Sequence, residues 1–275
     1  MAALGRSRSV YGGHMTSSPR QLQTALITGA SSGLGAEFAA QLAARGSDLV
    51  LVARREDRLR ELADRLEREH GVRVRVVPLD LAADDAASTL RKRLEADGVR
   101  IDGLVNNAGF GMRGALAEAD PERLDAMVRT NVGALTALTR EFLPDILTAH
   151  GALVNVASTA AYQPCPGMAA YGASKAFVLS FTEAIAEETR GSGARVLAIS
   201  PGPTRTEFFD EIGTRAAAFR RQQSVDEVVR RALDAVDAPA GPPSVVSGRL
   251  NAVAAGVVRL LPRRLALRIS GKVLA

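Results

Sequence analysis

The chain has 275 residues, of which 47% are hydrophobic and 24% charged, and these values suit one large α/β domain or two small ones. Its one cysteine, Cys165, excludes an intrachain disulfide and indicates a reducing, cytoplasmic compartment. No run reaches the ~20 consecutive apolar residues of a membrane-spanning helix. The net charge of +5 arises in residues 238–275, which hold six basic, no acidic and no aromatic residues, so nucleic-acid binding is not expected.

The first 22 residues contain three arginines but no apolar run long enough for a signal peptide. The GGHM sequence that ends at Met15 resembles an added junction or an upstream start before a natural Met15. We therefore expect residues 1–22 to be a loosely ordered leader outside the fold.

From Thr24 onward, short apolar runs alternate with segments of helical pattern. The apolar runs predict strands over 24–28, 48–52, 72–77, 101–106, 152–156, 194–199 and 244–246. Helices are predicted over 34–45, 56–70, 84–96, 121–148 with a bend near Asn131 or Pro144, 169–190, 206–221 and 225–236. This alternation predicts an α/β fold with a doubly wound, mostly parallel, Rossmann-like sheet in one domain over 23–237.

In such a sheet, ligands bind beyond the carboxyl ends of the strands. Gly29, Asn106 and Ser158 each stand at or just after the end of a predicted strand, so we expect them on the same rim of the sheet. The turn TGASSGLG (28–35) joins the first strand to its helix. Its glycines at 29, 33 and 35 allow a tight turn and close approach of the backbone to a pyrophosphate at the helix N-terminus. The alternative is a turn that only connects two elements.

The residues that follow the second and third strands bear on the adenosine half of a dinucleotide. An NAD-selective site places a carboxylate after the second strand, whereas this chain has Ala53, Arg54 and Arg55. A guanidinium suits a phosphate, so NADP(H) is favoured over NAD(H), with Arg54 on the 2′-phosphate and Arg55 as a solvated charge at the start of a helix. Asp80, followed by Leu81, is either an adenine ligand or a helix cap.

Tyr171 and Lys175 lie four residues apart in a predicted helix and so share one face. An ammonium beside a phenol is expected to lower the phenol pKa toward the range useful for proton transfer. Ser158 ends the fifth strand, where its hydroxyl can hold a substrate oxygen or simply form a turn. Asn131 lies within a predicted helix that it disfavours, which indicates either a tolerated polar residue or a local break that anchors a water.

These motifs together resemble the single-domain branch of the short-chain dehydrogenase/reductase family. The resemblance runs from about Thr24 to Val236 and rests on TGASSGLG (28–35), DL (80–81), NNAG (106–109), Asn131, Ser158, YGASK (171–175) and PGPT (201–204). It implies a hydride transfer between a nicotinamide and a carbonyl or alcohol carbon, with no metal.

The resemblance also implies a role for each matching residue. Tyr171 is implied to be the acid/base, Ser158 to orient the substrate oxygen, Lys175 to lower the tyrosine pKa and bind the nicotinamide ribose, and Asn131 to hold a relay water. The implied cofactor-binding residues are Gly29, Ser31, Ser32, Gly33, Leu34, Gly35, Arg54, Asp80, Leu81, Asn107, Ala108, Gly109, Tyr171, Lys175, Pro201, Gly202 and Thr204. Ser32 departs from the family pattern, because NADP-preferring members often carry a basic residue there.

The family further implies a homodimer or homotetramer paired through the helices that contain Asn131 and Tyr171. Residues 205–223 are expected to cover the substrate, and the apolar side chains there and nearby favour a lipophilic carbonyl compound over a sugar; they are Phe110, Met112, Met168, Phe208, Phe209, Ile212 and Phe219. An alternative function from another class is a non-catalytic NADP(H)-binding sensor or a membrane-peripheral protein.

Residues 238–275 are predicted to be a basic helical extension of the fold. Leu250, Val253, Val257, Leu260 and Leu261 lie along one side of a helix that Pro262 interrupts. Three interpretations remain open: a helix packed on its own domain or on a partner subunit, which we favour, peripheral membrane contact through 249–275, or a basic surface for an acidic acyl carrier.

Overall fold

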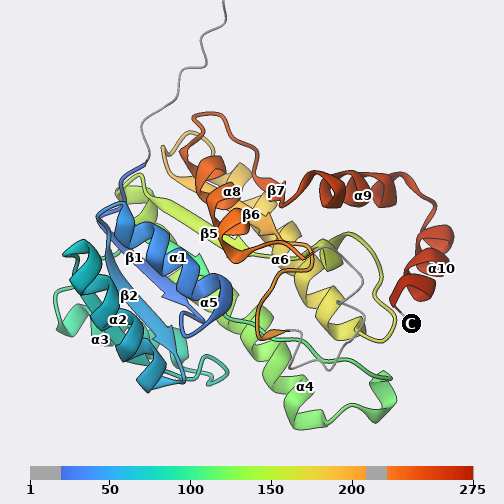
Figure 1. Ribbon diagram of the computed structural model, residues 1–275, viewed down its shortest axis with the longest axis horizontal. Coiled ribbons are helices and arrows are strands. Elements are labelled where there is room, and N and C mark those ends of the chain that lie inside the picture. Colours follow the sequence, from blue (N-terminus) through green and yellow to red (C-terminus); the bar gives the residue numbers. More distant parts are fainter. Residues whose placement is uncertain (1–19, 209–221, 275) are drawn as a thin grey trace, which may run out of the picture.

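Seven parallel strands form one sheet, as the strand–helix alternation predicted (Figure 1). The computed structural model describes residues 20–208 and 222–274. In the order β3-β2-β1-β4-β5-β6-β7, the strands are Val74–Pro78, Asp48–Ala53, Thr24–Thr28, Gly103–Asn106, Ala152–Val156, Arg195–Ser200 and Ser244–Val246. The chain winds outward in both directions from β1 and β4, so the crevice between these strands is the switch point where ligands bind.

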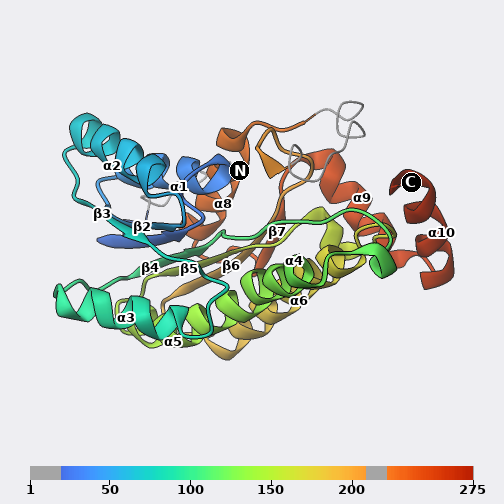
Figure 2. The same ribbon diagram turned by 90° about the horizontal axis from the view of Figure 1, so that it is seen from below.

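Helices cover both faces of the sheet (Figure 2). On one face lie α1 (Gly33–Ala44), α2 (Glu56–His70) and α8 (Val225–Asp237). On the other lie α3 (Ala86–Ala96), α4 (Pro121–Val128), α5 (Leu135–Thr148) and α6 (Ala169–Glu188). Neighbouring residues of a strand point to opposite faces, so Ile27 packs in one core with Phe38 while Leu26 packs in the other with Phe142.

The long helix predicted over 121–148 is divided into three parts. It begins at Pro121, where Asp120 caps it by accepting a hydrogen bond from the Arg123 backbone N–H at 2.7 Å. The middle part, Arg129–Ala134, is π-helical, and α5 follows it directly. A widened helical turn therefore lies at Asn131, and Pro144 lies inside α5, while the predicted bend itself stays a prediction.

Asn106 does not lie on the rim of the sheet, contrary to the prediction. Its side chain is 3% exposed, and its amide donates to Thr139 Oγ1 on α5 and to Asn155 Oδ1 on β5, both at 3.0 Å. Asn155 in turn donates to Thr182 Oγ1 on α6 at 2.9 Å. This chain of hydrogen bonds joins two strands to two helices inside the core, although the Asn106 Oδ1 atom is buried without a partner among the described residues.

Beyond β7, the C-terminal extension forms α9 (Arg249–Leu260) and α10 (Arg263–Leu274), which break at Pro262 as predicted. The apolar side of the first helix does not pack on its own domain, and packing on a partner subunit, the other half of that expectation, stays a prediction. Leu250 is 84% exposed and Leu260 is 87% exposed, because α9 instead turns Ala255 and Arg259 toward the domain. Among the described helices, none is both long and apolar enough to cross a bilayer.

The described ranges exclude 1–19, 209–221 and 275. Most of the predicted leader and most of the helix predicted over 206–221 therefore lie outside them, together with Phe209, Ile212 and Phe219.

Candidate active site

A cavity of about 910 Å³ opens where β1 to β6 end, within the size range of small-molecule sites. Residues that directly follow each of these six strands border it. Of the predicted site residues, those that line the cavity are Gly29, Ser31, Ser32, Gly33, Leu34, Arg54, Asp80, Leu81, Asn107, Ala108, Gly109, Ser158, Tyr171, Lys175, Pro201, Gly202 and Thr204. Gly35 and Asn131 do not line the cavity and instead contact segments that do.

The glycine turn after β1 needs its glycines for two different reasons. Gly29 and Gly33 have positive φ values of 64° and 55°, which disfavour a side chain. A Cβ on Gly35 would lie 2.2 Å from the Gly29 carbonyl oxygen, so α1 can approach the turn only with glycine at this position. The turn thus brings the first backbone N–H groups of α1 to the edge of the cavity.

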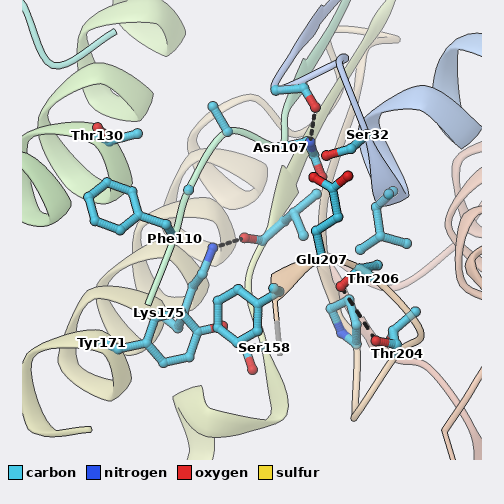
Figure 3. Close-up of a pocket in the computed structure, with 18 of the residues that line it drawn as sticks. Ser32, Asn107, Phe110, Thr130, Ser158, Tyr171, Lys175, Thr204, Thr206 and Glu207 are labelled. Atoms are coloured by element: carbon cyan, nitrogen blue, oxygen red, sulfur yellow. Dashed lines mark hydrogen bonds between the residues drawn. The ribbon is translucent and has the colours of Figure 1, made fainter. Parts of the chain in front are cut away.

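Thr28 and Asn107 join this turn to the segment after β4. Thr28 Oγ1 accepts hydrogen bonds from the backbone N–H groups of Asn107 at 2.9 Å and Ala108 at 3.0 Å. The Asn107 amide donates to the carbonyl oxygens of Thr28 at 2.9 Å and Gly29 at 3.2 Å (Figure 3). Asn107 therefore helps to fix the shape of this side of the cavity, and Thr28 is a supporting residue that the sequence analysis missed.

The arginines after β2 differ in their surroundings. Arg54 is exposed at the edge of the cavity. The Arg55 guanidinium donates to Ser31 Oγ at 3.0 Å and Ser32 Oγ at 2.8 Å, and it pairs with Glu207 at 2.9 Å. The interpretation of Arg55 as a merely solvated charge is therefore wrong. Because Arg55 reaches Ser32, it supplies a positive charge where the sequence lacks a basic residue at position 32.

Glu207 is a second residue that the sequence analysis missed. Its carboxylate contacts Arg58 at 2.5 Å as well as Arg55, and these two guanidinium groups lower the pKa of Glu207 to about 2. The next residue, Phe208, packs on the Tyr171 ring with 5.2 Å between centroids. The segment after β6 thus contacts Arg55 at one end of the cavity and Tyr171 at the other. No local pattern in the sequence indicated this connection.

The side chains of Asp80 and Thr204, which line the cavity, form hydrogen bonds with backbone groups two residues away in the chain. Asp80 Oδ1 accepts from the Ala82 backbone N–H at 3.0 Å within a turn. Since α3 begins at Ala86 after Asp85, Asp80 is not the helix cap that was the alternative prediction. Thr204 Oγ1 donates to the Gly202 carbonyl at 2.9 Å and so stabilises the turn after β6.

Ser158, Tyr171 and Lys175 meet at the other end of the cavity (Figure 3). Ser158 follows β5, whereas Tyr171 and Lys175 lie one turn apart on α6 and are 8% and 6% exposed. Lys175 Nζ donates to the Val156 carbonyl at 2.7 Å and lies 6.0 Å from the centre of the Tyr171 ring. The three side chains therefore line the same end of the cavity, with the Lys175 ammonium held by the backbone at the end of β5.

The pKa values of this group are set by burial. Burial raises the pKa of Tyr171 to about 12, although a hydrogen bond with Ser158 opposes this rise. Burial lowers the pKa of Lys175 to about 8, because a charged ammonium is poorly solvated there. The predicted lowering of the tyrosine pKa by Lys175 is therefore wrong for the cofactor-free protein.

Asn131 uses its side chain to hold the segment after β4. Its amide accepts from the Phe110 N–H at 3.1 Å, donates to the Phe110 carbonyl at 2.9 Å and donates to Ser174 Oγ at 3.1 Å. A Cβ on Gly109 would lie 2.9 Å from Asn131 Oδ1 and 3.5 Å from Lys175 Nζ. The π-helical turn is thus packed against the segment that passes beside Lys175.

Comparisons with known proteins agree with this geometry. The family described as short chain dehydrogenase matches residues 23–217. A relative, sulfoacetaldehyde reductase 2 of Chromohalobacter salexigens, is 40% identical over 186 residues, which cover 66% of this chain and 73% of the relative. The chain therefore belongs to the short-chain dehydrogenase/reductase family, an oxidoreductase acting on CH–OH groups with a nicotinamide cofactor.

Two solved structures resemble the whole fold. A short-chain dehydrogenase from Sphingobium yanoikuyae in complex with NADPH has a TM-score of 0.75 and 37% identity, covering 87% of this chain and 94% of that one. A 7β-hydroxysteroid dehydrogenase has a TM-score of 0.82 and 27% identity, covering 90% and 96%. The predicted Rossmann-like fold is confirmed by these similarities.

Proposed function

We propose that this protein is an NADP(H)-dependent reductase of a lipophilic ketone or aldehyde, or the matching alcohol dehydrogenase. The observation that carries the proposal is a single cavity that extends from Arg54 and Ser32 to Ser158, Tyr171 and Lys175. A dinucleotide in this cavity would place its phosphates at the glycine turn and its nicotinamide beside the tyrosine.

The proposed acid/base is Tyr171. In reduction, the hydroxyls of Ser158 and Tyr171 donate hydrogen bonds to the carbonyl oxygen of the substrate. A nicotinamide held by Lys175 beside Tyr171 would supply the hydride that the carbonyl carbon takes up. Tyr171 Oη would give its proton to the oxygen as the C=O double bond becomes a C–O single bond. A pKa of about 12 keeps Tyr171 protonated at neutral pH, which favours its role as the acid in reduction.

Lys175 is proposed to bind the nicotinamide ribose and to pass a proton toward Tyr171. Its pKa of about 8 lets it hold or release that proton near neutral pH. The Asn131 side chain is occupied by Phe110 and Ser174, so we assign Asn131 a positioning role. A relay water would then bind backbone oxygens of the π-helical turn, whose widened geometry alters the helical hydrogen-bonding pattern.

The preference for NADP(H) rests on the positive charge at the other end of the cavity. Arg54 lies exposed at its edge, and Arg55 spans the hydroxyls of Ser31 and Ser32. Guanidinium groups bind phosphate in a bidentate manner, so both are suited to a 2′-phosphate. The Sphingobium yanoikuyae neighbour is in complex with NADPH, which supports the same preference.

The preference for a lipophilic substrate rests on the walls near Tyr171. Phe110, Met168, Cys165 and Phe208 line this end, and Phe208 lies on the tyrosine ring. Met112, which was predicted to contribute, is not among the lining residues. A neighbour named as a 7β-hydroxysteroid dehydrogenase makes a bulky apolar ketone a suitable first probe.

A homodimer or homotetramer through α5 and α6 is part of the proposal. Phe177 on α6 is 39% exposed and stacks on Phe181, with 5.4 Å between ring centroids, which gives this helix an apolar surface suited to a partner. Light scattering coupled to size exclusion tests the subunit number directly.

The experiment that tests the function is the loss of NADPH absorbance with a panel of steroid ketones, aryl ketones, aldehydes and quinones. Wild-type protein is compared with Tyr171→Phe. Turnover that disappears in the variant supports the enzyme. Tight NADPH binding without turnover of any carbonyl would favour the alternative of a non-catalytic sensor, although a sensor has no need for the proton relay that ends at Ser158 and Tyr171.

A further inference from the structure

The C-terminal helices α9 and α10 extend from one end of the molecule beyond β7 (Figure 1). On its inner side α9 is firmly attached. The Arg259 guanidinium lies 4.8 Å from the centre of the Tyr162 ring and 3.8 Å from Glu183, and Asn251 donates to the Ser247 carbonyl at 2.9 Å. The orientation of α9 on the domain is therefore defined by specific contacts.

The outer side of α9 is apolar and uncovered. Leu250, Val253, Val257 and Leu260 are 84%, 65%, 51% and 87% exposed. Their spacing of three, four and three residues places them in one stripe along the helix. Large aliphatic side chains gathered in this way are a mark of an interaction surface rather than of ordinary solvent exposure.

The outer side of α10 is basic. Ala266 and Ser270 are 6% and 1% exposed and mark its buried side. Arg264, Arg268 and Lys272 are exposed and four residues apart, so they share another side of the helix. Leu265 and Ile269, which are 45% and 43% exposed, border this basic row.

The charge of the whole segment has one sign. Residues 238–275 contain six basic and no acidic residues. Arg259 contacts Tyr162 and Glu183 although its side chain is 54% exposed, and the other five basic residues are exposed as well; they are Arg249, Arg263, Arg264, Arg268 and Lys272. A partner that fits must offer both an apolar phase for the α9 stripe and negative charge for the cations.

We propose that α9 and α10 form a docking surface for an anionic lipid bilayer, on which they lie in the plane of the interface. Aliphatic side chains would enter the acyl boundary while arginines and the lysine contact lipid phosphates, as in interfacial amphipathic helices. A second copy of this chain fits less well, because a two-fold interface presents the same surface to itself and would bring these cations together.

The docking surface adjoins the substrate end of the cavity. Helix α9 packs on the 3₁₀ turn Thr159–Tyr162, which directly follows Ser158. On α10, a Cβ added at Gly271 would lie 3.9 Å from Pro166 Cγ, in the loop that carries the cavity residues Cys165 and Met168. If the proposed function holds, a substrate dissolved in the bilayer would enter beside the reacting groups without crossing water.

Vesicle co-sedimentation of the full chain tests the docking, with phosphatidylcholine vesicles compared with vesicles that also contain phosphatidylglycerol. We expect binding to the anionic vesicles only, and weaker binding as salt is raised. An apolar variant and a charge variant are each expected to lose about tenfold to a hundredfold in partition coefficient. The apolar variant combines Leu250→Ser, Val253→Ser, Val257→Ser and Leu260→Ser. The charge variant combines Arg264→Gln, Arg268→Gln and Lys272→Gln.

A matched control removes the same number of exposed cations elsewhere, by Lys92→Gln, Arg100→Gln and Arg140→Gln, and is expected to bind vesicles like the wild type. Retained thermal stabilisation by NADPH shows that each variant is folded.

The proposal is overturned if the wild type ignores anionic vesicles, or if both variants bind them unchanged. Two further results would overturn it by identifying another partner. If the wild type binds no vesicles and the apolar variant lowers the subunit number, the surface binds a second copy of the chain. If the wild type binds an acidic carrier protein and no vesicles, the partner is that carrier. Since the assay contains no substrate, an inactive protein that still binds vesicles leaves this inference intact and counts only against the proposed reaction.

Discussion

The nucleotide end and the substrate end of the cavity are built in different ways. At the nucleotide end, the turn after β1 and the segment after β4 are adjacent in the sheet and held together by Thr28 and Asn107. At the substrate end, the walls come from segments far apart in the chain, among them Phe110, Met168 and Phe208. The first end depends on backbone shape and the second on side-chain identity.

This difference suits an end that binds a constant chemical group and an end that can be adapted to one substrate. A dinucleotide presents the same phosphates and ribose to every member, so a glycine turn and a few amides suffice. The substrate end can vary without disturbing the sheet, because its residues lie on loops. In this protein, Glu207 and Phe208 link the two ends in one short segment.

The largest effect is expected at the substrate end, from Tyr171→Phe. Loss of the only proposed proton donor should lower kcat by about a hundredfold to ten-thousandfold, while the NADPH Kd stays within about twofold. Steady-state turnover and an NADPH fluorescence titration measure the two quantities. A variant with more than a tenth of wild-type kcat would remove Tyr171 from its assigned role.

At the nucleotide end, Arg54→Ala should raise the NADPH Kd by about tenfold to a hundredfold, which corresponds to one lost hydrogen-bonded charge pair. The NADH Kd should hardly change, because NADH has no 2′-phosphate. Isothermal titration with both cofactors measures this, with Arg60→Ala on α2 as an exposed control. Equal losses for NADPH and NADH would show that Arg54 does not recognise the phosphate.

Between the two ends, Lys175 should control the pH dependence. Its pKa of about 8 means that the ammonium is charged below this pH and neutral above it, whereas Tyr171 stays protonated to about 12. The kcat/KM for NADPH, which reports the free enzyme, should therefore be flat below pH 7 and fall about tenfold between pH 7 and pH 9. A profile that remains level to pH 10 would contradict this assignment.

The smallest effect is expected from Glu207→Gln. This variant tests the short segment that joins the nucleotide end of the cavity to the substrate end. The carboxylate lies against Arg55, where it would repel a 2′-phosphate, so its neutralisation should lower the NADPH Kd about twofold to fivefold. Glu61→Gln, also exposed on the nearby α2, is the control. A weaker NADPH complex in the Glu207 variant would mean that the ion pair supports the cofactor site instead.

Much of the fold and the site could be predicted because their signals are local. The strands follow from apolar runs, the glycine turn from a short motif, and the Tyr171–Lys175 pair from helical spacing. Glu207 could not be predicted, because its partners Arg55 and Arg58 lie about 150 positions earlier in the chain. The exposure of Leu250 could not be predicted either, since periodicity identifies an apolar side but not what covers it.

By itself, the sequence determined the alternation of strands and helices, the glycine turn after β1, and which residue types stand at the strand ends. These depend on backbone preference and periodicity over a few residues. Only the tertiary structure decided that Asn106 lies in the core, that Arg55 reaches Ser32, and that burial raises the Tyr171 pKa. Contact and desolvation depend on segments that are distant in the chain, and no short window of residues contains that information.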